Sequence, residues 1–526
     1  MSPETLITIL SFAVAIYALL PLERVLDLKI KFAWYDLMVV ATAITLVFYI
    51  LYQPVLQALG LALDLGPWRW GFNASLTTFS VIVGALLWVF LRIRFGGLRR
   101  QRIQSFSRLA TDLLHKRKTG ELAELLRRYL PELMAIYENN YTLVRLRHWL
   151  APPTWQGLVQ RRHPSKGWPK PVRVGARALS RLLPAHERSR DSARETVHRI
   201  LLSDPFVETV ATAYPYLAMD VLKYDVREAA GFQEKWFRCV LDDPHSILFA
   251  EIRRNQTNRS GAYHRYQYDP ENRCLWFYFH DVRTAERLHL YKSIGDYLCA
   301  DYGKRRRNSD SDRFNQPLDR YHDVEIWQCP AYAVIRLFDY MVTEALHQGI
   351  PWHMWLHYLP IFADKIVLNI DPREDVDLQS EFPTPYHYQV YEIVDVLCKW
   401  IASGQDAPEY HDEQARERAI PMQSVIALGR VMNTVLLAPA LAGRFASEMV
   451  ESVVARADDW RNEPHLEIYR EALIETLAKG GRNHGVPDHW PAILRQHLED
   501  VDVIRYHRTQ EAIAAAIDAH WDEHDN

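Results

Sequence analysis

Residues 33–56 read AWYDLMVVATAITLVFYILYQPVL, an apolar stretch in which the one charged residue, Asp36, lies close to the start. Two further stretches, LITILSFAVAIYALLPL at residues 6–22 and SLTTFSVIVGALLWVFL at residues 75–91, carry no charged residue. A helix that spans a bilayer needs ~20 consecutive, mostly apolar residues. Buried helices of soluble domains seldom run so long without a charge. The sequence therefore predicts a membrane protein with three N-terminal transmembrane helices, at about residues 6–22, 33–56 and 75–95.

The first apolar stretch is predicted to be a retained anchor. A cleaved signal peptide has a basic N-terminal flank and a small-x-small cleavage site. The flank at residues 1–5, MSPET, contains no Lys or Arg, and the end of the stretch at residues 19–23, LLPLE, contains no such site.

Basic residues that flank the apolar stretches predict the orientation. Three lie between the first two stretches and only Arg69 lies between the second and the third. Five follow the third stretch: Arg92, Arg94, Arg99, Arg100 and Arg102. Because cytoplasmic flanks of membrane helices are rich in Lys and Arg, we expect the N-terminus outside and everything after Arg92 in the cytoplasm. The composition fits a bacterial inner membrane.

The near-neutral total charge of −3 conceals a division along the chain. Residues 98–192 hold 20 Lys and Arg against 7 Asp and Glu, whereas acidic residues outnumber basic ones in residues 193–526. Prolines interrupt the basic part after residue 151, which predicts a linker or an irregular arm. The predicted organisation is a membrane region at residues 1–97, a basic juxtamembrane region at 98–192 and an acidic cytoplasmic body at 193–526, of one or two lobes.

The basic region is predicted to contact anionic lipids of the cytoplasmic leaflet, which attract juxtamembrane cations. Apolar residues at helical spacing, from Ile103 and Phe106 to Ala110 and Leu113, run through it. The predicted lipid contacts are Arg99, Arg100, Arg102, Arg108, Lys116, Arg117 and Lys118. Either the helix lies in the membrane plane, or it packs on the cytoplasmic body. Nucleic acid is the weaker alternative, because the region follows a membrane helix directly and the body is acidic.

The cytoplasmic body is predicted to be mostly helical, with a small antiparallel β meander at Ser246 to Phe279. Helical stripes run from Val334 to Ala345, from Val390 to Ile401 and from Leu466 to Leu477. Thr384 before Pro385 has the pattern of an N-cap followed by a proline in the first helical turn.

Catalytic signatures are missing from the sequence. It contains no GxxxxGK[ST], GxGxxG, GxSxG or CxxC pattern, so we predict no organic cofactor and no thiolate zinc site. Histidines supply one alternative, a divalent metal site. His353 and His357 share one face if this segment is helical, and Glu344 with His347 forms an ExxH pattern upstream. Aromatic packing explains these histidines equally simply, and we favour it.

The leading functional prediction is a sensor, scaffold or protein-interaction module at the membrane, with a protein partner or a homo-oligomer as its assembly. One alternative is a membrane-tethered metal-dependent enzyme that uses the region of His347, His353 and His357. The other is an oligomeric pore or membrane effector. The candidate pore-lining residues are Thr42, Thr45, Thr77 and Thr78. Active transport is disfavoured because no ionisable residue lies in the middle of a predicted span.

Overall fold

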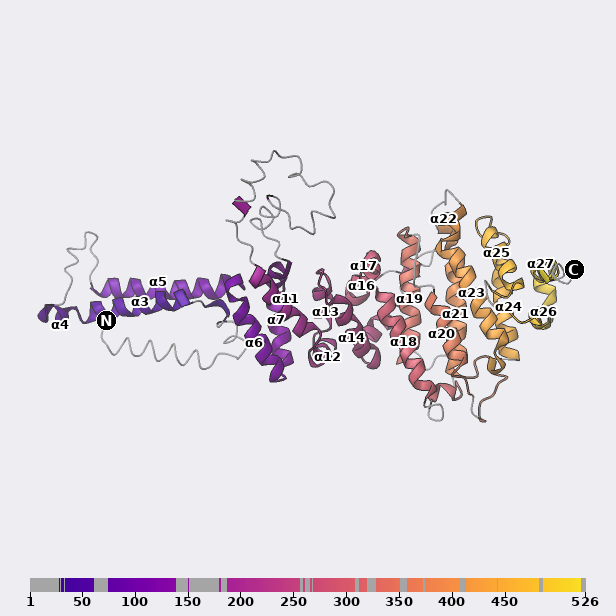
Figure 1. The fold of residues 1–526 in the computed structure, drawn as a ribbon, viewed down its shortest axis with the longest axis horizontal. Helices are drawn as coiled ribbons and strands as arrows, with labels where there is room; N and C mark the ends of the chain where they lie inside the picture. Colours follow the sequence, from indigo (N-terminus) through magenta and orange to yellow (C-terminus); the bar gives the residue numbers. More distant parts are fainter. Residues whose placement is uncertain are drawn as a thin grey trace. The chain divides into compact units, whose positions relative to one another are not determined.

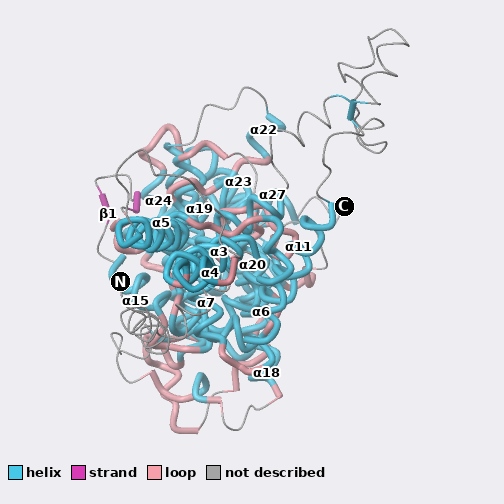
Figure 2. Tube along the Cα trace, turned by 90° about the vertical axis from the view of Figure 1, so that its left-hand side faces the viewer, coloured by secondary structure: helices cyan, strands magenta, loops and turns pink. Residues whose placement is uncertain are grey.

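The computed structural model describes residues 28, 30–32, 34–60, 74–138, 150, 179–180, 187–255, 259–260, 265–266, 268–307, 312–318, 328–350, 357–371, 374–406, 413–441, 443–481 and 486–521. Helix accounts for most of these residues (Figure 2). The chain divides into two compact units, Met1–Thr209 and Val210–Asn526. The mainly helical character of the prediction is therefore correct, while two of its details are not.

The first unit consists of a helical hairpin and a small bundle (Figure 1). Its helices are α3 (Trp34–Leu51), α4 (Gln53–Ala58), α5 (Ala74–Phe95), the 3-10 turn η1 (Arg100–Arg102), α6 (Ile103–His115), α7 (Thr119–Glu138), α11 (Glu187–Leu201) and the start of α12 (Asp204–Ala213). α3 packs along α5 with the start of one beside the end of the other. The predicted boundary between residues 192 and 193 falls inside α11.

The prediction of three membrane-spanning helices is wrong. Among the described residues, only Leu76–Phe95 and Ile420–Leu437 have both the length and the hydropathy of a membrane span, and the second is 61% buried in the second unit. The helix Trp34–Ile50 is also apolar but is shorter. The stretch at 33–56 is not one helix, because α3 ends at Leu51 and α4 begins at Gln53 with a proline in its first turn. The stretch at 6–22 lies outside the described residues.

The apolar face of α6 is covered by protein. Ile103, Phe106, Ala110 and Leu113 are buried, and α6 packs against both α7 and α11. Of the two arrangements that the sequence left open, this is the packed helix. Because its apolar stripe is already buried, α6 would have to leave the bundle in order to lie in a membrane plane.

The second unit is a stack of helical layers (Figure 1). Its helices are α13 (Pro215–Leu222), α14 (Ala229–Asp242), α15 (Ile247–Asn255), α16 (Arg273–Phe279), α17 (Arg283–Arg287), α18 (Leu290–Arg306), α19 (Pro330–His347), α20 (Tyr358–Val367), α21 (Pro385–Ala402), α22 (Glu413–Glu417), α23 (Ile420–Leu437), α24 (Arg444–Trp460), α25 (Glu467–Ala478), α26 (Trp490–Glu499) and α27 (Val503–Trp521). α14 packs on α18, α18 on α20, α20 and α21 on α23, α23 on α25, and α25 on α27. Each layer thus contacts mainly the layers next to it, as in solenoid proteins.

The prediction of a β meander at Ser246 to Phe279 is also wrong. This segment forms α15 and α16, and its β structure among the described residues is one antiparallel pair of two-residue strands, β1 (Arg259–Ser260) and β2 (Arg265–Tyr266). An apolar run of six residues, such as Cys274 to Phe279, fits a buried helix as well as a strand. Here Cys274, Leu275, Tyr278 and Phe279 are buried at helical spacing.

The helical stripes that the sequence predicted form the core of the second unit. The stripe from Val334 to Ala345 is buried in α19, the stripe from Val390 to Ile401 in α21, and the stripe from Leu466 to Leu477 in α25. α21 begins at Pro385 with Thr384 as its N-cap, as predicted, although the Thr384 hydroxyl bonds His387 Nδ1 at 2.8 Å.

Candidate functional site

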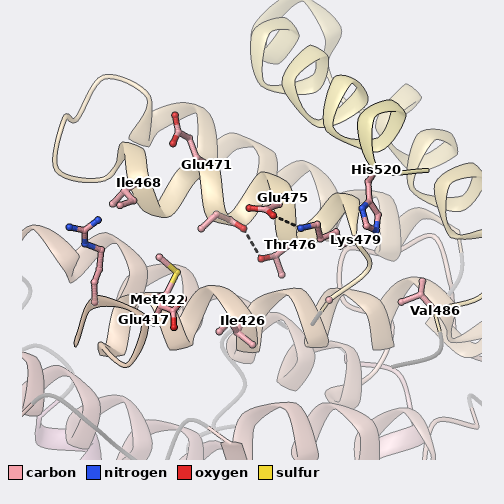
Figure 3. Close-up of a pocket in the computed structure, with 13 residues that line it drawn as sticks. Glu417, Met422, Ile426, Ile468, Glu471, Glu475, Thr476, Lys479, Val486 and His520 are labelled. Atoms are coloured by element: carbon pink, nitrogen blue, oxygen red, sulfur yellow. Dashed lines mark hydrogen bonds and ion pairs between the residues drawn. The ribbon is translucent and has the colours of Figure 1, made fainter. Parts of the chain in front are cut away.

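An open groove lies between α23 and α25, and α27 closes one end of it (Figure 3). It has a cavity of about 660 Å³. Met422 and Ile426 lie one turn apart on α23, and Ala472 and Thr476 lie one turn apart on α25. These apolar or small side chains form the floor of the groove in two rows, one from each helix, with one helical turn between neighbours in a row. Such a floor can accept the ridge of another helix.

Charged side chains line the rim of the groove. Glu471, Glu475 and Lys479 follow one another at single-turn spacing on α25, and all three are exposed. Glu475 and Lys479 form an ion pair (Figure 3), and His520 of α27 lies beside them. The site therefore combines an apolar floor with a polar, wet rim, which is the usual composition of a protein-binding surface.

Glycines set the shape of the groove. A Cβ atom at Gly429 would lie 2.2 Å from Thr476 Cγ2, so the close approach of α23 and α25 requires glycine there. α25 ends at Ala478, and the turn after it contains Gly480 and Gly481, whose φ angles are +72° and +87°. Asn433 Nδ2 donates to Gly480 O at 2.8 Å and ties this turn to α23. The two rows of the floor are thereby held at a fixed spacing.

A second polar cluster lies at the base of the α3–α5 hairpin. Asp36 is fully buried and accepts from Arg92 Nε at 3.1 Å and from Trp88 Nε1 at 3.1 Å. Arg92 Nη2 and Arg99 Nη1 both donate to Tyr35 Oη, at 3.0 and 2.6 Å. The charge that interrupts the apolar run at 33–56 is therefore paired with a partner 56 residues later, which sequence spacing did not reveal.

The predicted lipid-contact residues divide between the hairpin base and the surface of the bundle. Arg99 and Arg102 belong to the base, where Arg102 Nη2 donates to Phe32 O at 2.7 Å. Arg108 and Arg117 are exposed on α6 and just after it. Lys116 is paired with Asp112 at 2.8 Å, and Lys118 with Glu121 at 2.9 Å. Arg100 lies in the η1 turn and is half-buried.

The residues of the predicted metal site do not form a cluster in the described part of the chain. Glu344 and His347 lie on α19, and Gln348 Nε2 donates to the buried Glu344 Oε2 at 3.3 Å. His357 is the residue before α20, where burial and the charge of Arg430 lower its pKa. His353 lies outside the described residues. Within the described ranges no three His, Cys, Asp or Glu side chains gather in a metal-binding group, so the metal site stays a prediction.

Two buried polar groups, which the sequence reading missed, hold the second unit together. Arg336 of α19 donates from Nη2 to Glu392 Oε2 of α21 at 2.9 Å, and this contact joins the two helices. Its Nη1 lies 3.6 Å from Asp339 Oδ2 on α19. Glu251 is fully buried and accepts the backbone N–H of Cys274 and Leu275 at 3.0 Å each, so it caps α16. Burial raises the pKa of Glu251, and the hydrogen bonds from the α16 backbone oppose this effect.

A serine, a histidine and an aspartate meet between α24 and α26. Ser447 Oγ lies 2.9 Å from His497 Nδ1 and donates to Asp500 Oδ2 at 2.7 Å. In a hydrolase triad the base takes the serine proton and the carboxylate holds the base. Here the hydroxyl lies between the other two groups and its proton points to the carboxylate. The arrangement is therefore a link between two helices, and we assign no catalysis to it.

The comparisons with known proteins give no relative: no protein family, no curated protein and no solved structure matches this chain.

Proposed function

We propose that the protein is a membrane-anchored scaffold, in which the α3–α5 hairpin enters a bilayer and the groove of the helical stack binds a partner protein. The observation that carries the proposal is the exposed surface of the hairpin. Phe79, Leu86 and Phe90 are each about 60% exposed on α5, and only 11% of the Leu76–Phe95 helix is buried. Exposed apolar surface on this scale is unfavourable in water and favourable in hydrocarbon.

The distribution of charge supports a cytoplasmic location for the second unit. Cations gather at the end of the hairpin where α3 begins and α5 ends, whereas the connection between the helices contains only Arg69. Cytoplasmic flanks carry such an excess of Lys and Arg. Asp36, a buried carboxylate of the hairpin, lies at the same end and is paired with the buried Arg92, so the surface that the rest of the hairpin presents is apolar enough for a bilayer.

The chain's own cysteines provide the test of membrane location and side. Cys239 and Cys299 are half-buried, and the other three cysteines are buried. A membrane-impermeant maleimide should label the native protein in inverted vesicles and not in right-side-out vesicles. The variant Asp64→Cys places a thiol between α4 and α5 and should gain labelling in right-side-out vesicles. If carbonate extracts the protein from the membrane, the proposal is contradicted. Labelling of the native protein in right-side-out vesicles would contradict it as well.

The groove is proposed to bind an amphipathic helix of the partner. Its two-row floor matches apolar residues spaced by one turn, and the exposed carboxylates of Glu471 and Glu417 favour basic residues beside that apolar face. Binding of one helix would bury the floor that is now open, which supplies the hydrophobic part of the affinity.

A photoreactive amino acid tests the groove in living cells. Ile468 lines the groove, and Ile361 on α20 lies outside it, yet both side chains are 37% exposed, so Ile361 is a matched control. We expect a discrete cross-linked product from position 468 only, and loss of this product in the additional variant Ala472→Arg, which fills the floor. Equal products from both positions, or none from position 468, would contradict a groove-bound partner.

A further inference from the structure

The base of the hairpin carries three arginines without a carboxylate partner among the described residues. Arg99 bonds the Tyr35 hydroxyl, Arg102 bonds a backbone carbonyl, and Arg94 is exposed at the end of α5. Neutral acceptors fix the position of a guanidinium but leave its charge uncompensated. Asp36 does not compensate them, because it is buried and bonded to Arg92. The base therefore presents oriented positive charge to an outside anion.

The positions of Arg92 and Arg99 show how closely these charges are placed. Both guanidinium groups donate to the same Tyr35 oxygen, at 3.0 and 2.6 Å. Two like charges at one acceptor repel each other, and an anion bound nearby would relieve this repulsion. The same tyrosine ring also lies beneath Arg92, with the guanidinium carbon 5.8 Å from its centre.

Glycine makes this approach of the chain possible. A Cβ atom at Gly96 would lie 2.3 Å from the backbone oxygen of Arg92, so the turn that ends α5 needs a residue without a side chain. After this turn, Arg99 and Arg102 lie against Tyr35 and Phe32 at the start of α3. Residues from both ends of the hairpin thus form one cationic surface.

The depth of this surface points to a lipid. The arginines lie where the apolar surface of α3 and α5 ends. Trp34, which is 69% exposed, precedes the Tyr35 that Arg99 bonds, and Trp88 donates to Asp36 at the same end of the hairpin. Exposed tryptophan and tyrosine mark the headgroup level of a bilayer. Phosphate groups lie at that level, and arginine binds phosphate through two parallel N–H donors. A phosphate bound there can therefore belong to a lipid whose chains lie along the apolar hairpin.

We propose that Arg94, Arg99 and Arg102 form a binding site for the phosphate of an anionic phospholipid of the cytoplasmic leaflet. This inference rests on the proposed membrane insertion of the hairpin. It differs from general attraction between the membrane and a basic chain, because it assigns the selectivity to three named side chains at the hairpin base. The exposed cations on α6 and directly after it, Arg108, Lys116, Arg117 and Lys118, are not part of the site.

The test uses the full chain in nanodiscs and spin-labelled lipids. The fraction of motionally restricted phosphatidylglycerol label, compared with phosphatidylcholine label, measures lipid preference at the protein surface. We expect the native protein to prefer the anionic label by at least about five-fold, which is the factor that a single cation near a bilayer surface contributes. The double variant Arg99→Gln, Arg102→Gln should lose most of this preference. The control Arg108→Gln, Lys116→Gln removes the same number of positive charges from α6 and the residue after it, and this variant should keep the preference.

The outcomes separate the lipid site from the proposed function. Equal loss in both double variants, or no preference in the native protein, overturns the lipid site while insertion still supports the anchor. A protein that does not enter nanodiscs refutes the anchor itself. Inorganic phosphate is titrated onto the protein in phosphatidylcholine nanodiscs. If inorganic phosphate binds under these conditions and the binding depends on Arg99 and Arg102, the site belongs to a soluble anion, and the proposal of a lipid site is overturned. Circular dichroism of each variant verifies its helical content.

Discussion

Acid should weaken the second unit through one histidine, His387. Its side chain is 2% exposed, its Nδ1 lies 2.8 Å from Thr384 Oγ1, and its ring meets Phe445 of α24 edge-on with centres 4.9 Å apart. Burial lowers the pKa of His387 from 6.5 to about 4, because the charged ring would lose its hydration. The folded protein therefore keeps this imidazole neutral at pH values where the unfolded chain takes up a proton.

The direction and size of the effect follow from this pKa difference. Between pH 6.5 and about pH 4, His387 binds a proton more readily in the unfolded chain than in the folded protein. The free energy of unfolding therefore falls as the pH falls. The contribution of His387 is fully present above pH 6.5 and is lost on passing down to about pH 4. At about 1.4 kcal/mol per pH unit, the loss amounts to about 3 kcal/mol over this window.

Hydrogen–deuterium exchange of the α21 amides measures the local free energy of opening, after correction for the intrinsic effect of pH on exchange. His387→Gln keeps a polar group beside Thr384 and cannot take up a proton in this range. We expect the native protein to lose about 2–3 kcal/mol more than this variant between about pH 7 and about pH 4.5. His465→Gln replaces an exposed histidine and should behave as the native protein does. If native protein and His387→Gln lose equal protection, the reasoning about His387 is refuted.

Four further substitutions test the packing of the second unit. Gly429→Val would force a side chain against Thr476 and should lower the free energy of unfolding by about 1–3 kcal/mol in urea titrations, whereas Gly303→Ala, in open space on α18, should be neutral or raise it by up to about 1 kcal/mol. Arg336→Leu leaves two buried carboxylates without their cation, so we expect a loss of about 3–5 kcal/mol, seen as a lower midpoint of thermal unfolding. Glu251→Ala uncaps the first turn of α16, and its amides should exchange faster by more than ten-fold, in line with about 2 kcal/mol. Unchanged exchange there would argue against the cap.

Local patterns predicted the helices well because the apolar spacing and the start signal that specify a helix lie within a few neighbouring residues. The stripe from Val390 to Ile401 and the Thr384–Pro385 start specify α21 without knowledge of the rest of the chain. The same reasoning failed for Cys274 to Phe279, since a short apolar run does not distinguish a strand from a buried helix. It also failed at residues 33–56, where hydropathy was given more weight than the proline in the first turn of α4.

The sequence named Arg99 and Arg102 as lipid contacts, but the geometry of the candidate sites could not be predicted, because it depends on pairs that are distant in sequence. The floor of the groove joins Ile426 to Thr476, and its spacing depends on the absence of a side chain at Gly429. The base of the hairpin joins Asp36 to Arg92, 56 positions away. A sequence read one segment at a time marks Asp36 as an exception in an apolar stretch, but it does not identify the partner.

The layered contacts of the second unit imply a particular order of unfolding. α27 packs on α24, α25 and α26, at the end of the series. In such a quasi-one-dimensional array the end layer has a neighbour on one side only, so it separates at a lower cost than any layer within. Limited proteolysis should therefore shorten the chain from its carboxyl end in steps of one layer. His520 of α27, which lines one end of the groove, would be lost in the first of these steps, before α23 and α25 separate from each other.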